Sequence, residues 1–250
     1  MKVPSNLQIR TVFPCLCIFG IVLLAGCSRT SNPEANRSRG SNSFPAGEMR
    51  AATQQPAAAE AAPDFDYYLL TLSWSPEYCH GHSNSPECNG SHPGFVVHGL
   101  WPQRNNGQWP SHCSNAPGLP NPSTMLDIMP DPHLVAHEWA THGTCSGLTA
   151  RQYFALVRQA FQSIRIPAPL TGPTQSKTMS ATALKQSFTE VNSGMAADDI
   201  AISCHNRYLS AVEFCLSKDL HPIACQAVRD CTARSIRIPG SGPMRNRRRF

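Results

Sequence analysis

The stretch YYLLTLSW, at residues 67–74, is the segment that decides the fold class. Every second side chain is large and apolar, and these side chains make one face of the segment: Tyr68, Leu70, Leu72 and Trp74. An alternation with a period of two residues is typical of a β-strand that packs one face against a core. The segment therefore predicts a strand with one large apolar face.

The segments on either side extend this pattern. Residues 95–98 predict a short strand that enters a Gly-Leu-Trp-Pro turn, and residues 208–214 predict another strand. Apolar residues three or four apart predict helices at 133–142 and 150–164, and one that begins after Ser180. Because strands and helices do not alternate regularly, we expect an α+β fold with a central, mainly antiparallel sheet flanked by helices.

The first 27 residues have the features of an export signal. The apolar run from Thr11 to Ala25 is too short to span a membrane permanently. It leads into Leu24-Ala25-Gly26-Cys27, which resembles the lipobox of bacterial lipoproteins, so we expect Cys27 to carry a lipid anchor. The alternative is an ordinary cleaved signal, which would leave a freely soluble protein.

Composition divides the rest of the 250-residue chain. Residues 28–63 are rich in Ser, Asn, Ala, Pro and Gln and predict a disordered tether, residues 64–238 predict one globular domain, and residues 239–250 form a basic tail. The formal net charge is +5, but acidic residues slightly outnumber basic ones between 64 and 238. The expected domain therefore has few fixed cations for phosphates, and polyanion binding should depend only weakly on salt unless ionised histidines or the basic tail contribute.

The cysteines indicate an oxidising compartment. The chain has 11 cysteines, and removing Cys15 and Cys17 with the signal and Cys27 for the lipid leaves eight. No two of these have the two-residue gap of a zinc knuckle or a thioredoxin-type site, which favours structural disulfides. Spacing alone does not settle how the eight pair: Cys79, Cys88, Cys113, Cys145, Cys204, Cys215, Cys225 and Cys231.

Two blocks concentrate the chemistry, VHGLWP at residues 97–102 and HEWATHGTC at residues 137–145. They resemble the two active-site signatures of the ribonuclease T2 family, in the same order, and the chain between about Asp66 and Cys231 agrees with that family. The resemblance implies an α+β fold and a metal-independent endoribonuclease, without a cofactor, that leaves a 2′,3′-cyclic phosphate.

The chemistry of RNA cleavage explains why two histidines suit this reaction. The 2′-hydroxyl must lose a proton and the leaving 5′-oxygen must gain one, and imidazole can do both near neutral pH. His98 and His142 are the candidate pair. The sequence does not fix which is base and which is acid, but we favour His142 as base. Glu138 lies four residues before His142 on the expected helix, so its carboxylate is expected to orient that imidazole and raise its pKa.

The resemblance also implies roles for neighbouring residues. His137 is implied to contact the phosphate, Glu138 to stabilise the transition state, and Trp101 to line the base site. Trp109 stands where relatives often have tyrosine, and its flat ring can stack on a base. The disulfide pattern of the family implies three pairs and leaves the fourth by elimination: Cys113–Cys145, Cys204–Cys231, Cys215–Cys225 and Cys79–Cys88.

One position departs from the family signature. Thr141 stands where many members carry a lysine, a cation that would neutralise charge on the pentacoordinate phosphorus. A catalytically weak or inactive RNA-binding lipoprotein of the same fold is therefore the alternative function. A zinc protease helix requires His-Glu-x-x-His, whereas His137 and His142 are five apart, so no metal site is expected here.

No feature of the sequence indicates a protein partner. We expect a monomer that takes RNA as substrate and meets a membrane only through the lipid anchor. The export signal and cysteines place it in the periplasm as an anchored lipoprotein, or outside the cell as a secreted protein.

Overall fold

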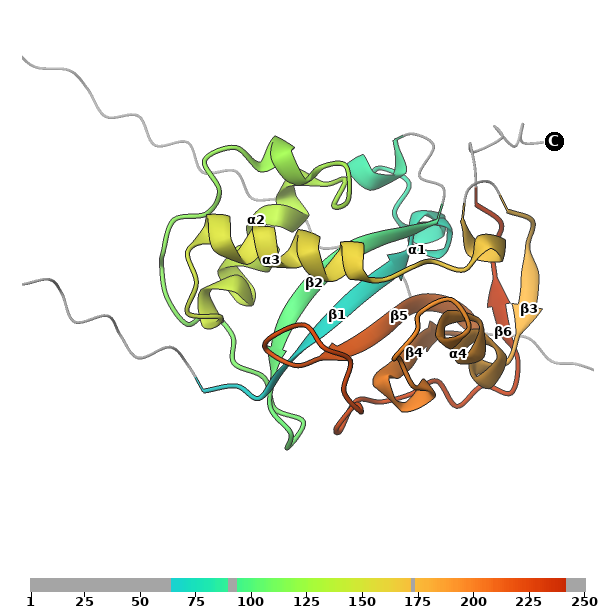
Figure 1. Ribbon diagram of the computed structural model, residues 1–250. Coiled ribbons are helices and arrows are strands. Elements are labelled where there is room, and N and C mark those ends of the chain that lie inside the picture. Colours follow the sequence, from blue (N-terminus) through green and yellow to red (C-terminus); the bar gives the residue numbers. More distant parts are fainter. Residues whose placement is uncertain (1–63, 90–93, 172–173, 242–250) are drawn as a thin grey trace, which may run out of the picture. The chain divides into compact units, whose positions relative to one another are not determined.

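The computed structural model describes residues 64–89, 94–171 and 174–241 (Figure 1). Six strands in these residues form one sheet: β1 Tyr67–Trp74, β2 Phe95–Gln103, β3 Lys177–Met179, β4 Ile200–His205, β5 Tyr208–Leu216 and β6 Ile236–Ile238. Four α-helices accompany the sheet: α1 Ser75–Gly81, α2 Pro132–Thr141, α3 Ala150–Ser163 and α4 Ala181–Thr189.

The strand order confirms the α+β prediction. The main path through the sheet is β2-β1-β5-β6-β3, and β4 pairs with β5 beside this path. Only the short β5–β6 pairing is parallel, and the other pairings are antiparallel. Along this path β2 is an end strand, so one of its two edges makes no ladder with another strand of the described sheet.

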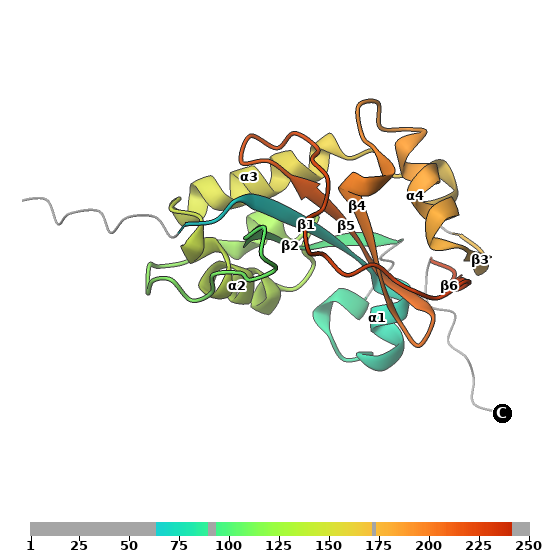
Figure 2. The same ribbon diagram turned by 90° about the horizontal axis from the view of Figure 1, so that it is seen from below.

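The core lies on the face of β1 that the alternation predicts. Leu70, Leu72 and Trp74 are completely buried there, and α3 packs Tyr153 and Val157 against the same core. Figure 2 shows α3 and α4 on one side of the sheet and α1 on the other. The second face is covered by a smaller cluster around Tyr67, Leu69 and Cys215.

Capping residues fix where the helices begin. Thr149 Oγ1 accepts a hydrogen bond from the Gln152 backbone N–H, and the Gln152 side chain accepts one from the Thr149 N–H, which forms a capping box at the start of α3. Ser180 caps α4, as predicted. The helix buries Leu184 and Phe188 and ends at Thr189, so Val191 lies beyond it and is exposed.

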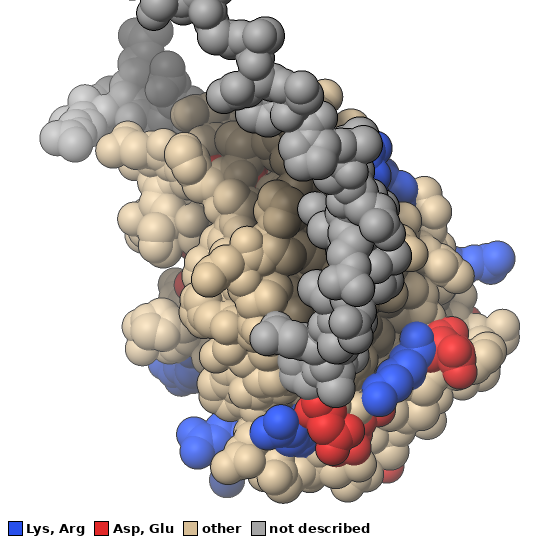
Figure 3. All heavy atoms as spheres, turned by 90° about the vertical axis from the view of Figure 1, so that its left-hand side faces the viewer, with Lys and Arg blue, Asp and Glu red and all other residues tan. Residues whose placement is uncertain are grey.

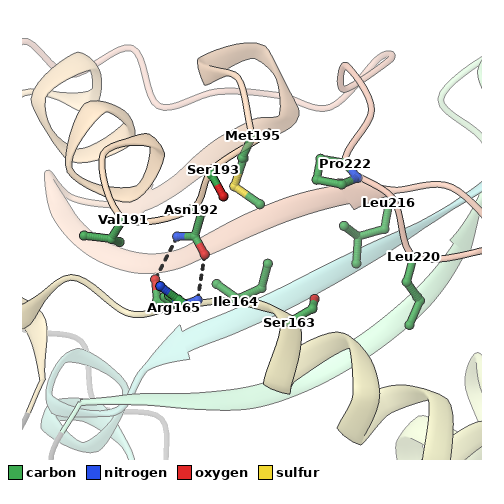
Figure 4. Close-up of a pocket in the computed structure, with 10 residues that line it drawn as sticks. All are labelled: Ser163, Ile164, Arg165, Val191, Asn192, Ser193, Met195, Leu216, Leu220 and Pro222. Carbon is green, nitrogen blue, oxygen red and sulfur yellow. Dashed lines mark hydrogen bonds between the residues drawn. The ribbon is translucent and has the colours of Figure 1, made fainter.

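Asn192 joins the end of α3 to the end of α4 (Figure 4). Its side-chain oxygen accepts a hydrogen bond from the Arg165 N–H at 2.7 Å, and its amide nitrogen donates to the Arg165 and Phe188 carbonyl oxygens. A hollow beside this link is lined by apolar and polar side chains, including Met195 and Leu216. All polar atoms of the Asn192 side chain are thus used in holding the two helix ends together.

Several predictions concern the ends of the chain. The expected signal sequence, Cys27 and the tether all lie outside the described residues. Of the expected tail, residues 239–241 are described, and the Pro239 carbonyl oxygen accepts a hydrogen bond from Trp74 Nε1 at 3.0 Å. Across the three described ranges, no helix has the length and apolar character needed to cross a membrane.

Candidate active site

A β-bulge places His98. Thr71 of β1 faces Gly99 and Leu72 faces Val97, so His98 is the extra residue without a partner in the register. Bulges bend a strand and re-aim a side chain. The displaced imidazole has its Nδ1 in a hydrogen bond with Ser73 Oγ at 3.1 Å, and its Nε2 is turned toward the helix that carries the second block.

The predicted Gly-Leu-Trp-Pro turn is wrong, because β2 continues through it to Gln103. Proline cannot donate a hydrogen bond to a ladder, but Pro102 is tolerated because β2 is an end strand of the sheet path. The continued strand stays paired with β1 and holds Trp101 opposite Leu69. Trp101 is therefore carried by a rigid strand and not by a loop.

The second block ends helix α2. Asp131 caps the start of the helix by accepting a hydrogen bond from the His133 N–H at 2.8 Å, and Pro132 occupies the first turn. The helix runs over 132–141, so His142 is its capping residue and not part of its last turn, as the predicted range 133–142 had it. The His142 N–H still donates to the Glu138 carbonyl oxygen at 3.0 Å, which keeps the two residues one turn apart.

Trp101 brings the two histidines to one place. Its ring centroid lies 5.4 Å from that of His98 and 5.2 Å from that of His142. Its Nε1–H donates to Glu138 Oε2 at 2.7 Å. One indole therefore contacts both candidate proton-transfer groups and the candidate carboxyl group, which come from a strand, a helix end and a helix.

Glycine is required at position 99 for this arrangement. A Cβ atom added there would overlap a carboxylate oxygen of Glu138 and the indole nitrogen of Trp101. The bare backbone of β2 thus lets the carboxyl group of α2 approach the strand closely enough to meet the indole.

Glu138 is buried and largely deprived of partners. Its side chain is 1% exposed, Oε1 lies 3.6 Å from His98 Nε2, and that oxygen has no hydrogen-bond partner among the described residues. Burial raises the pKa of Glu138 to about 8, and the hydrogen bond from Trp101 lowers it only in part. The carboxyl group is therefore mainly neutral at pH 7.

Both histidines are biased toward the neutral form. Burial lowers the pKa of His98, and the nearby His137 lowers it further. Burial also lowers the pKa of His142 to about 4, with smaller contributions from His137, His98 and His112. The expectation that Glu138 raises the pKa of His142 is wrong, because the Glu138 carboxyl group is itself held neutral and turns toward Trp101 and His98.

The expected substrate-binding residues differ in how far they are exposed to solvent. His137 is exposed on α2, and its effect on the pKa values of His98 and His142 shows that it lies near both. Trp101 is half-buried against the second-face cluster. Trp109 is 58% exposed, so its ring is accessible, but no described contact joins it to the histidines.

The loop that follows Trp109 is fastened to the end of α2. A disulfide joins Cys113 to Cys145, and the Cys113 N–H donates to Thr144 Oγ1 at 3.1 Å. The His112 N–H donates to the Thr141 carbonyl oxygen at 2.8 Å. No pattern in the sequence indicates a role for His112 or Ser73, although His112 directly precedes Cys113, which bonds to the last cysteine of the second block.

All eight domain cysteines form disulfides in the pairs that the family resemblance implies: Cys79–Cys88, Cys113–Cys145, Cys204–Cys231 and Cys215–Cys225. Such a density of bridges is typical of proteins that fold in oxidising compartments. In the part of the chain that the structure describes, no group of three or more His, Cys, Asp or Glu side chains is arranged to hold a metal ion.

Fixed charges are sparse on one side of the molecule. Figure 3 shows the side on the left of Figure 1, where most of the visible described surface carries no Lys, Arg, Asp or Glu, and the charged side chains lie mainly toward the margins.

Two histidines around one indole form a candidate active site in this α+β domain. Residues 65–225 match the model of the ribonuclease T2 family, so the chain belongs to that family. It is 37% identical over 113 residues to a protein from Aeromonas hydrophila named ribonuclease, a match that covers 44% of this chain and 51% of the relative.

A protein from Haemophilus influenzae named probable ribonuclease is 37% identical over 120 residues, covering 41% of this chain and 44% of the relative. The chain thus spans about half the length of these two curated relatives. Among solved structures, RNase NT in complex with 5′-AMP has a TM-score of 0.54 at 23% identity, covering 71% of this chain and 99% of that one. An RNase-related protein from Calystegia sepium has a TM-score of 0.58 at 21% identity, with 71% and 98% covered. These structures share the fold.

Proposed function

We propose that the protein is an endoribonuclease that cleaves single-stranded RNA by transesterification and leaves 2′,3′-cyclic phosphate ends. The observation that carries the proposal is the contact of His98 and His142 with the same indole, beside a buried carboxyl group. Transesterification needs one group that takes a proton and one that gives a proton on two sides of a phosphate. Membership of the ribonuclease T2 family supports this choice of reaction.

His142 suits the base in this mechanism. The low pKa of His142, about 4 because of burial, keeps its imidazole unprotonated at neutral pH and able to accept the proton of the 2′-hydroxyl. His98 then protonates the leaving 5′-oxygen. Its pKa is lowered by burial in the free protein, so it must gain its proton when an anionic phosphate binds, because a nearby negative charge favours the imidazolium.

Glu138 acts in this mechanism as a neutral acid. A carboxyl group held protonated near neutral pH can donate a hydrogen bond to an oxygen on which negative charge develops, and a pKa of about 8 gives Glu138 that property. His137 is exposed beside both histidines, where it can contact the phosphate. Trp101 and Trp109 offer ring faces for bases. Two histidines supply both proton transfers, so the proposed mechanism includes no metal or cofactor.

Incubation of the purified protein with RNA in EDTA tests the function. We expect cleavage that persists in EDTA and yields cyclic-phosphate ends, with no cleavage of DNA, which lacks the 2′-hydroxyl. His98→Ala and His142→Ala should each reduce the rate by at least about 100-fold. His133→Ala, which changes an exposed histidine on α2, is the matched control. A normal rate in either site variant would remove that residue from the mechanism.

Thr141 favours a second candidate function, an RNA-binding protein with weak or no activity, because a neutral side chain stands where many relatives carry a cation. RNA binding without cleavage in the same assay would support it.

We further propose that the protein is exported and anchored by a lipid on Cys27. The four disulfides support export, and the lipobox-like residues before Cys27 support the anchor. Cys27→Ser should move the protein from the membrane fraction to the soluble fraction, and unchanged fractionation would reject the anchor.

A further inference from the structure

The contact between His112 and Thr141 lies outside the mechanism described above. Thr141 is the last residue of α2, directly before His142, and its hydroxyl cannot carry a positive charge. His112 comes from the loop on the other side of the disulfide Cys113–Cys145, and its Nε2 lies 3.5 Å from Thr141 Oγ1. A histidine from the loop therefore stands against the one position of the second block that departs from the family signature.

The backbone of His112 is held firmly in this place. Its φ of 52° lies in the left-handed region, which costs a non-glycine residue roughly 1–2 kcal/mol. The His112 N–H donates to the Thr141 carbonyl oxygen at 2.8 Å, and the next residue is fixed by the disulfide and by its bond to Thr144. These contacts hold the loop in a conformation that it would otherwise avoid.

The imidazole of His112 makes only a weak contact with Thr141. The distance of 3.5 Å to Thr141 Oγ1 is at the limit for a hydrogen bond, so this contact is weak. The side chain of His112 is exposed, and a ligand can reach it. Three imidazoles act on the charge of His142, namely His137, His98 and His112, which places His112 within electrostatic range of the proposed base.

We propose that His112 binds the scissile phosphate as an imidazolium and supplies the positive charge that Thr141 cannot. This proposal rests on the proposed function and adds a residue to the same site. Histidine is a cation in the weakly acidic range, and a bound phosphate favours its charged form. The imidazole of His112 comes from the loop that the Cys113–Cys145 disulfide ties to α2, whereas Thr141 belongs to helix α2 itself.

Kinetics of four variants, each compared with the parent protein, test the proposal with a dinucleoside phosphate as substrate. His112→Gln keeps a polar side chain without the charge and should lower kcat by about 10- to 100-fold, in the range for loss of one donor to the transition state. Thr141→Lys alone should change kcat less than about threefold, because the site already holds a cation. The double variant should regain most of the lost rate. His133→Gln is the matched control on α2.

Wild-type kcat in His112→Gln, or a folded double variant that stays as slow as His112→Gln, would overturn the assignment. Thermal unfolding of each variant, compared with the parent, shows whether the fold is retained.

A second measurement separates this proposal from the proposed function. Inorganic phosphate titrated into the parent, followed by NMR of the histidine ring protons, should shift the His112 resonance, and affinity should fall about tenfold in His112→Gln. In the free His112→Gln protein the pKa of His142 should rise, because one of the three imidazoles that lower it is gone. If the parent never cleaves RNA but phosphate affinity falls as expected, the proposed function fails while the phosphate-binding role of His112 stands. Equal phosphate affinity in both proteins rejects that role.

Discussion

Replacing Glu138 by glutamine should change how the stability of the protein depends on pH. The carboxyl group is 1% exposed, and burial raises its pKa from an ordinary 4.5 to about 8. In the unfolded chain it ionises above about pH 4.5, whereas in the folded protein it stays neutral up to about pH 8. The wild-type protein therefore loses stability between these two pH values, because ionisation favours the unfolded chain.

The size of the effect follows from the pKa difference. A tenfold change in proton affinity is worth ~1.4 kcal/mol, so the full difference corresponds to about 5 kcal/mol and the part between pH 5 and pH 7 to about 2–3 kcal/mol. Glutamine has nearly the same shape, and its side-chain oxygen can still accept the hydrogen bond from Trp101. It cannot ionise, so this loss should be absent from Glu138→Gln.

Urea unfolding with intact disulfides at pH 5, 6, 7 and 8 measures the difference. The free energy of unfolding of Glu138→Gln minus that of the wild type should rise by about 2–3 kcal/mol between pH 5 and pH 7. His98 and His142 act in the opposite direction, since their lowered pKa values cost stability as the pH falls, but they are present in both proteins. Glu190→Gln, an exposed glutamate after α4, is the control. A difference that stays constant with pH would refute the claim that Glu138 is held neutral.

Three further variants probe the same assembly. Gly99→Ala should destabilise the protein by roughly 1–3 kcal/mol and reduce cleavage, because its Cβ overlaps the Glu138 carboxylate; urea unfolding and the RNA assay measure both. Trp101→Phe removes the indole N–H whose hydrogen bond lowers the pKa of Glu138. When Glu138→Gln is compared with Glu138 in Trp101→Phe protein, the difference in the free energy of unfolding should therefore keep rising to a higher pH than in the wild type. Replacing Cys113 and Cys145 together by serine opens a loop with a sequence separation of 32 and should cost about 4 kcal/mol in urea unfolding, and an unchanged midpoint would contradict this.

The sequence was informative where a pattern is local. Alternating apolar residues in 67–74 predicted β1 with its buried face, and capping by Ser180 predicted the start of α4. The two short blocks identified His98, Glu138 and His142, which the structure brings around Trp101.

Local spacing failed where distant segments decide the outcome. The turn predicted after His98 is a strand, because pairing with β1 continues past the bulge. Helical spacing predicted that Glu138 faces His142, but its carboxyl group contacts Trp101 and His98 of strand β2. The contacts of Ser73 with His98 and of His112 with Thr141 depend on the bulge and on a disulfide, neither of which has a local signature.

The disulfide between Cys113 and Cys145 makes assembly of the candidate site depend on an oxidising compartment. A newly made chain in the reducing cytosol would have the imidazoles of His98 and His142 but no covalent tie between the loop of His112 and the end of α2. Oxidation after export would supply that tie. Under the proposed activity and export, the transcripts of the producing cell would meet only a form of the protein that lacks this tie.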